Sequence, residues 1–172
     1  AQGLIKSGAG DLALGGASSY TGTTLVNEGR LVLAHADALG AISAGTVVAS
    51  GAQLRINTLA DTVFAAEPLI LSGAGFPSGG ALRNATNNNT WQGTITLAAN
   101  ATIGAASGTT LTLERTNGAT LDLGVYNLVV DGAGTVRVNG AIAGSGQISK
   151  TGSGQLVVSN SILAATIQSN SL

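Results

Sequence analysis

Short aliphatic segments recur along this 172-residue chain, separated by glycine, serine, threonine and asparagine. Several of them alternate apolar and other residues, which is the period of a strand with one buried face. The residues between them favour turns, because they tolerate positive φ or bond their own backbone. The segments are Leu12–Leu14, Thr24–Val26, Leu31–Leu33, Thr46–Val48, Leu54–Ile56, Leu69–Leu71, Ile95–Leu97, Leu111–Leu113, Leu121–Leu123, Leu128–Val130, Val136–Val138 and Leu156–Val158. The sequence therefore predicts an all-β fold of many brief strands; the best helical candidate, Ala34–Ala44, is short and interrupted by Gly40.

Composition narrows the function classes. Apolar residues make up 44%, enough for a real core, and aromatics only 3%, so leucine, valine, isoleucine and alanine must build that core. Charged residues make up 9% and the net charge is −1, which leaves no basic patch for nucleic acid. The absence of cysteine excludes disulfides and thiolate metal sites. No apolar run approaches the roughly 20 residues of a membrane helix, so no membrane span is expected.

The chain is also similar to itself. Residues Gly3–Leu14 return as Gly146–Val158, and Lys6 corresponds to Lys150 at an offset of 144 residues. Repetition together with very short strands favours a β-solenoid over a β-sandwich binding module, which stays an alternative. With about 20 to 24 residues per coil, the chain would form roughly seven or eight coils. We expect a single segment, residues 1–172, slightly longer than one unit of a ~144-residue tandem repeat.

Three stretches of the chain carry a family resemblance. The matching positions are Lys6, Gly8, Gly10, Leu12 and Leu14, then Tyr20, Thr21, Gly22 and Thr24, then Gly29, Leu31 and Leu33. In that order and spacing, residues 3–33 resemble the autotransporter-associated β-strand repeat, also called the passenger-associated transport repeat. Residues 80–113 resemble the segments between such repeats, and "GAIAGSGQISKTGSGQLVVSN" resembles the opening of the next one. Residues 159–172 lack the Tyr-Thr-Gly continuation.

The resemblance implies a right-handed parallel β-helix, exported through a Gram-negative outer membrane and displayed or released outside the cell. Such passengers act as adhesins or as stalks, so the expected function is attachment to surfaces or filament formation. The expected partners are identical chains stacked end to end, neighbouring repeats of a longer chain, surface glycans, or a host or biofilm matrix. Parallel β-helices also bind or cleave polysaccharides, and this is the alternative function.

Candidate chemistry is sparse, and no catalytic, cofactor or metal residue is assigned. His35, the only histidine, lies in a loop or helical turn and is read as a surface residue. The carboxylates Asp122, Asp131 and Glu114 are not clustered in sequence, although stacked coils could bring them together. A calcium-binding nonapeptide would need Asp11 to recur, but Gln155 takes its place in the second copy.

The remaining conspicuous side chains receive structural interpretations. Trp91 is expected to pack over the core at a corner, with an exposed sugar platform as the alternative, and Tyr20 to cover a corner. Arg55 and Arg137 occupy outward positions of strands and could pair with carboxylates of adjacent coils. Residues Asn84–Thr90 suit either a loop or an asparagine stack.

Overall fold

The computed structural model describes residues 2–77, 79–159 and 166–169, and every regular element in them is a β-strand. The strands are β1 (Leu4–Lys6), β2 (Asp11–Leu14), β3 (Thr24–Val26), β4 (Gly29–Leu33), β5 (Thr46–Val48), β6 (Ala52–Ile56), β7 (Val63–Phe64), β8 (Leu69–Gly73), β9 (Leu82–Asn84), β10 (Asn88–Trp91), β11 (Ile95–Ala105), β12 (Thr110–Leu113), β13 (Ala119–Asp122), β14 (Leu128–Gly132), β15 (Thr135–Val138), β16 (Ala141–Ala143), β17 (Gln147–Lys150), β18 (Gln155–Val158) and β19 (Thr166–Ser169). Residues 34–44, the best helical candidate, form turns instead. Most of the segment 159–172 lies outside the described residues.

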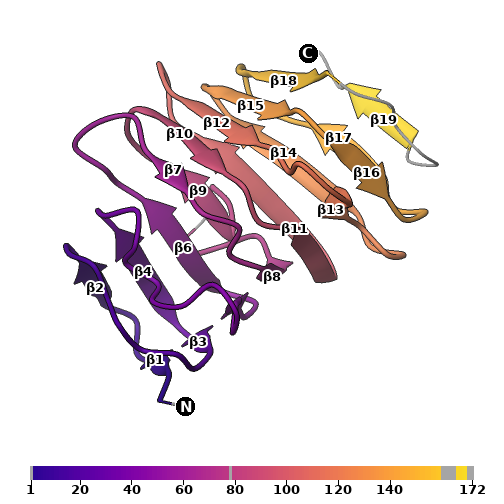
Figure 1. Cartoon of the computed structure of the whole chain (residues 1–172). Coiled ribbons are helices and arrows are strands. Elements are labelled where there is room, and N and C mark those ends of the chain that lie inside the picture. Colours follow the sequence, from indigo (N-terminus) through magenta and orange to yellow (C-terminus); the bar gives the residue numbers. More distant parts are fainter. Residues whose placement is uncertain (1, 78, 160–165, 170–172) are drawn as a thin grey trace.

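The strands stack in three rows, of which two begin in the first coil with β1 and β2 and the third begins at β7 (Figure 1). Row A contains β1, β3, β5, β8, the first part of β11, β13 and β16; row B contains β2, β4, β6, β9, the last part of β11, β14, β17 and β19; row C contains β7, β10, β12, β15 and β18. Every strand pair in the described part of the chain is parallel. The chain therefore folds into a β-solenoid of about seven turns, as the sequence predicts.

Coil length varies more than the sequence suggests. The register separates Leu4 from Thr24 by 20 residues, but Ile95 from Leu121 by 26. Strand β11 runs for 11 residues without a break and joins rows A and B, because no turn residue with positive φ interrupts it. All twelve aliphatic segments lie on strands, with Leu123 just beyond the end of β13. The strands β1, β7, β9, β10, β16, β17 and β19 were not predicted.

Inward-facing aliphatic side chains fill the space between the rows. Because partner residues in parallel strands lie in direct register, leucines stack on leucines: Leu31 pairs with Leu54, and Leu54 with Leu82. All three are fully buried. Burial of such side chains contributes about 1.5–3 kcal/mol each, so a continuous column of them holds the coils together. The first and last strands, β1 and β19, lie at opposite ends of this rod (Figure 1).

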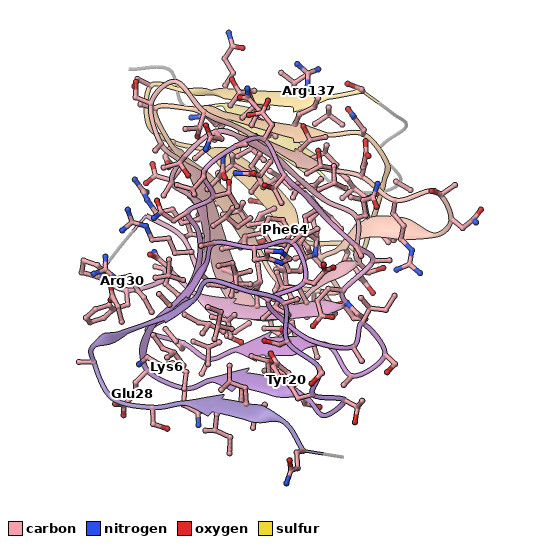
Figure 2. The ribbon with its side chains drawn as sticks, turned by 60° about the vertical axis from the view of Figure 1, so that its left-hand side comes forward. Lys6, Tyr20, Glu28, Arg30, Phe64 and Arg137 are labelled. Atoms are coloured by element: carbon pink, nitrogen blue, oxygen red, sulfur yellow. The ribbon has the colours of Figure 1, made fainter. Side chains whose placement is uncertain are left out.

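Some polar residues are inside as well. Thr24 and Thr46 start their strands with fully buried side chains. Lys6 is also buried, and its Nζ donates hydrogen bonds to the carbonyls of Gly8 (2.5 Å) and Glu28 (2.9 Å). Glu28 Oε2 in turn accepts from Gly8 N at 3.1 Å, and Figure 2 shows Lys6 beside Glu28 near the N-terminal end. The lysine of the repeat motif thus secures the corner that follows it.

The second copy of the motif has the same local structure on a different side of the coil. Lys150 Nζ donates to the carbonyl of Gly152 at 3.0 Å, as Lys6 does to Gly8, and both glycines have positive φ. The first copy, however, forms β1 and β2 in rows A and B, whereas the second forms β17 and β18 in rows B and C. The second copy is therefore displaced along the rod relative to the first. It is also rotated about the axis of the rod, so that each of its strands lies on the next side of the coil.

Candidate functional site

A corner rich in asparagine is buried between rows B and C. Asn89 Nδ2 donates to Asn84 Oδ1 (2.7 Å) and to the Thr86 carbonyl (2.7 Å). Asn89 Oδ1 accepts from Thr58 Oγ1 and from Thr62 N, both at 2.9 Å. The two buried asparagines come from β9 and β10, so this stretch is part strand and part corner, with an internal polar network. Because all four hydrogen-bonding sites of the Asn89 amide are used, the network is structural and not a ligand site.

Trp91 is fully buried and packs against Phe64, with ring centroids 5.6 Å apart. Its Nε1 donates a hydrogen bond of 3.1 Å to the Glu67 carbonyl. Figure 2 shows Phe64 enclosed by the ribbon. The core position predicted for Trp91 is thus confirmed, and the indole cannot serve as an exposed platform for a sugar.

Glu67 is a buried carboxylate that lies near other polar side chains, which include Thr46, Thr24 and Tyr20. Its Oε1 accepts from Thr46 Oγ1 at 2.8 Å, whereas Oε2 has no hydrogen-bond partner among the described residues. In the adjacent coil, Thr24 Oγ1 is 2.7 Å from the Tyr20 hydroxyl, which covers the corner as predicted. Burial raises the pKa of Glu67 above its usual range, and the hydrogen bond from Thr46 opposes this rise. Burial also raises the pKa of Tyr20.

The raised pKa of Glu67 predicts a pH-dependent stability. A raised folded-state pKa means that the folded protein holds the proton more tightly than the unfolded chain does. Glu67 therefore makes its full contribution to stability when the pH is below the pKa of this carboxyl group in the unfolded chain, about 4.3. That contribution is lost as the pH rises through the pKa of the carboxyl group in the folded protein. We expect Glu67→Gln to remove this decline, measured by urea unfolding across that pH range. Glu114→Gln, a matched change at a surface position, should keep the decline, and a wild-type profile in Glu67→Gln would contradict the assignment.

The other titratable candidates lie apart from one another, each within its own corner. His35 Nδ1 accepts a hydrogen bond from Asp37 N at 3.0 Å in a surface turn, which agrees with its interpretation as a turn residue. Asp122 Oδ1 accepts from Gly124 N, and Asp131 Oδ1 from Thr151 Oγ1. Glu114 Oε1 lies 3.4 Å from Gln92 Nε2. Stacking of the coils does not bring these carboxylates into a pair.

Glu114 lines a hollow of about 250 Å³ at the ends of the row C strands, with Gln92, Arg115, Thr116 and Asn139. Within the described ranges, no group of three or more histidine, aspartate or glutamate residues lies close enough to hold a metal ion. The same part of the chain contains no helix long and apolar enough to cross a membrane.

Arg55 and Arg137 lie at the outward positions of β6 and β15, as the alternation predicts. Figure 2 places Arg137 at the periphery of the ribbon. The expected ion pairs with adjacent coils are not formed, because neither arginine has a salt bridge within the described residues. Asp11 instead pairs with Arg30 of the next coil, with 2.7 Å between Oδ1 and Nε. That pair was not predicted, since it depends on the register of β2 against β4.

Comparison with known proteins agrees with this architecture. The family described as Passenger-associated-transport-repeat matches residues 4–33, which form β1 to β4 in the first two coils. A curated relative, the adhesin BmaC autotransporter of Brucella suis biovar 1 (strain 1330), is 35% identical over 168 residues. The match covers 86% of this chain but 5% of the relative, so the chain spans about one-twentieth of that protein's length. No solved structure matches the chain. The chain therefore carries a passenger-associated-transport-repeat at residues 4–33 and is similar, over most of its length, to a segment of an autotransporter adhesin.

Proposed function

We propose that the chain is a non-enzymatic extracellular β-solenoid segment of an exported passenger, which holds and presents an adhesive surface away from the cell. The observation that carries this proposal is the unbroken parallel stacking of about seven coils, which begins with a passenger-associated-transport-repeat. At about 4.8 Å per coil, such a stack extends roughly 30–35 Å. Each added coil extends the rod by the same step, which suits a stalk.

The distribution of polar groups supports a binding surface more than a catalytic one. A glycosidase needs two carboxyl groups about 5–9.5 Å apart across the scissile bond. The hollow at the ends of row C contains one carboxylate, Glu114, accompanied by Gln92, Arg115 and Asn139. Such a set can hydrogen-bond a ligand, but it lacks the second carboxylate that hydrolysis requires.

Attachment is tested with beads coated with the purified chain. They should be retained under flow on at least one biological surface, chosen from epithelial cell layers, extracellular matrix and bacterial biofilm matrix. The soluble chain should compete for this retention, and albumin-coated beads should wash off. Retention no greater than that of albumin on all three surfaces would contradict the adhesive role.

The end of the rod suggests its partners, which are neighbouring repeats or identical chains. Among the described residues, strands β1 and β2 each pair along one edge only, with a strand of the second coil. Open strand edges recruit further strands. Because successive copies of the motif are rotated by one side, a stacked neighbour would continue the rod with the same rotation. Stacking by translation along an axis does not close on itself and builds a filament.

Edge stacking predicts self-association of the isolated chain. Leu12 points inward at the open edge and is half-buried, whereas Ala13 beside it points outward. Leu12→Lys should abolish association, because a stacked coil would bury the new charge, and Ala13→Lys should not. Sedimentation velocity measures both. Wild-type protein that stays monomeric at high concentration, or equal association of Leu12→Lys, would refute end-to-end stacking.

A further inference from the structure

We propose that a basic groove on row B binds the carboxylate or sulfate group of an acidic sugar. The groove has a volume of about 480 Å³, within the 300–1,000 Å³ typical of ligand pockets. Its lining includes Arg30, Arg55, Gly79, Arg83 and Asp131. The inference rests on the proposed adhesive role and names the ligand chemistry through which that role would be exercised.

Two arginines form the centre of the groove. Arg55 of β6 is the direct register partner of Arg83 of β9, so their backbones are about 4.8 Å apart on adjacent coils. Like charges placed opposite each other in a ladder are destabilising. Neither arginine forms a salt bridge in the described ranges, although Arg30 nearby is neutralised by Asp11. An oxyanion between the two guanidinium groups would relieve the repulsion and accept several charge-assisted hydrogen bonds.

The guanidinium group of Arg83 is held in place by the backbone. Its Nη1 donates to the Gly79 carbonyl at 3.2 Å. A Cβ atom at residue 79 would lie 2.3 Å from that Nη1, and one at Gly104 would lie 2.0 Å from the Gly79 carbonyl oxygen. A side chain at residue 104 would therefore collide with the backbone of this loop, and one at residue 79 would displace the guanidinium group from its present position. The orientation of Arg83 therefore exists before any ligand arrives, which reduces the entropy cost of binding.

Asp131 adds a negatively charged part to the groove, beside the positively charged part that the arginines form. It lies on the row that contains Arg55 and Arg83, because Arg83 pairs with Gly104 and Gly104 with Asp131. Its carboxylate can accept hydrogen bonds from hydroxyl groups but repels further anions. A ligand with one oxyanion beside several hydroxyls satisfies both parts, and an acidic sugar has this pattern. Duplex DNA and polyglutamate carry anions without free sugar hydroxyls beside them, so they would leave the Asp131 carboxylate without the hydroxyl donors that an acidic sugar supplies.

The test measures binding of oligogalacturonate, which carries carboxylates, and of heparin oligosaccharide, which carries sulfates, by biolayer interferometry. Dextran is the neutral control. We expect at least one acidic glycan to bind, dextran not to bind, and the double variant Arg55→Gln/Arg83→Gln to weaken binding by about tenfold or more. Arg137→Gln removes one positive charge, against two in the double variant, from another row and should change affinity by less than about twofold. Melting temperatures no lower than that of the wild type in both variants would show that the rod is intact.

Several outcomes would overturn the proposal. These are no binding to either acidic glycan, equal losses in Arg137→Gln and the double variant, or tighter binding to duplex DNA or polyglutamate than to the glycans. The bead assay separates this proposal from the adhesive role on which it rests. If the double variant is retained as well as wild type, the groove assignment fails and adhesion stands. If wild-type beads wash off while the acidic glycan still binds in the groove, the adhesive role fails instead.

Discussion

Replacement of Trp91 by alanine is expected to lower the free energy of unfolding by about 3–5 kcal/mol. The indole is fully buried, stacks on Phe64 and donates a hydrogen bond to the Glu67 carbonyl. Truncation leaves a cavity between row C and the opposite wall, and an orphaned carbonyl inside it. Urea unfolding followed by circular dichroism measures the change, since the variant has lost the chain's only tryptophan.

The matched control is Tyr126→Ala, which removes an aromatic ring from a partly exposed position. Its cost should be within about 0.5 kcal/mol, as for most surface substitutions. Trp91→Phe should fall between the two, because it keeps a ring against Phe64 and loses the hydrogen bond. A loss below about 1 kcal/mol in Trp91→Ala would contradict the core position of this side chain.

Replacement of Asn89 by alanine is the second large effect, with an expected loss of about 3 kcal/mol or more. The Asn89 amide makes four hydrogen bonds, and their partners on Asn84, Thr58, Thr62 and Thr86 would all lose it. Unpartnered buried polar groups cost about 1–3 kcal/mol each, although water entering the cavity would recover part of this. The same urea titration measures the loss.

Asn88→Ala provides the control within the same strand. Asn88 points outward, where its Oδ1 accepts from Thr110 N and its Nδ2 lies 3.4 Å from Asp61 Oδ2. Loss of these exposed hydrogen bonds should cost about 1 kcal/mol. Equal losses in the two variants would show that the asparagine corner is hydrated and not an internal network.

The fold could be predicted because its signal is local and repeated. Segments such as Leu54–Ile56 show which face is buried, and glycines such as Gly8 mark corners through their positive φ. Family resemblance then supplies the parallel stacking, which alternation alone does not distinguish from a sandwich. Two of the missed strands lack an aliphatic signal, since β10 reads Asn-Asn-Thr-Trp and β7 has only two residues. Others, such as β1 (Leu-Ile-Lys) and β16 (Ala-Ile-Ala), contain aliphatic residues but do not alternate them with polar ones.

The groove could not be predicted from the sequence. It depends on Arg55 lying opposite Arg83, which is 28 residues further along the chain. Register partners in row A, by contrast, are separated by 20 to 26 residues. A one-residue error in coil length would turn Arg83 to the opposite face of its strand. Likewise, nothing in "AAEPL" indicates that Glu67 is buried, since that depends on Thr46 of the preceding coil.

The most direct test of the parallel solenoid is a series of distances between spin labels along row A. Outward positions Ile5, Thr96, Asp122 and Ala143 lie on one line, since register pairs connect them coil by coil. The chain has no cysteine, so labels attach only where one is introduced. From Ile5, the stacked coils predict roughly 19, 24 and 29 Å to the other three, an increment of about 4.8 Å per coil. Distances that do not increase in this order would contradict the solenoid.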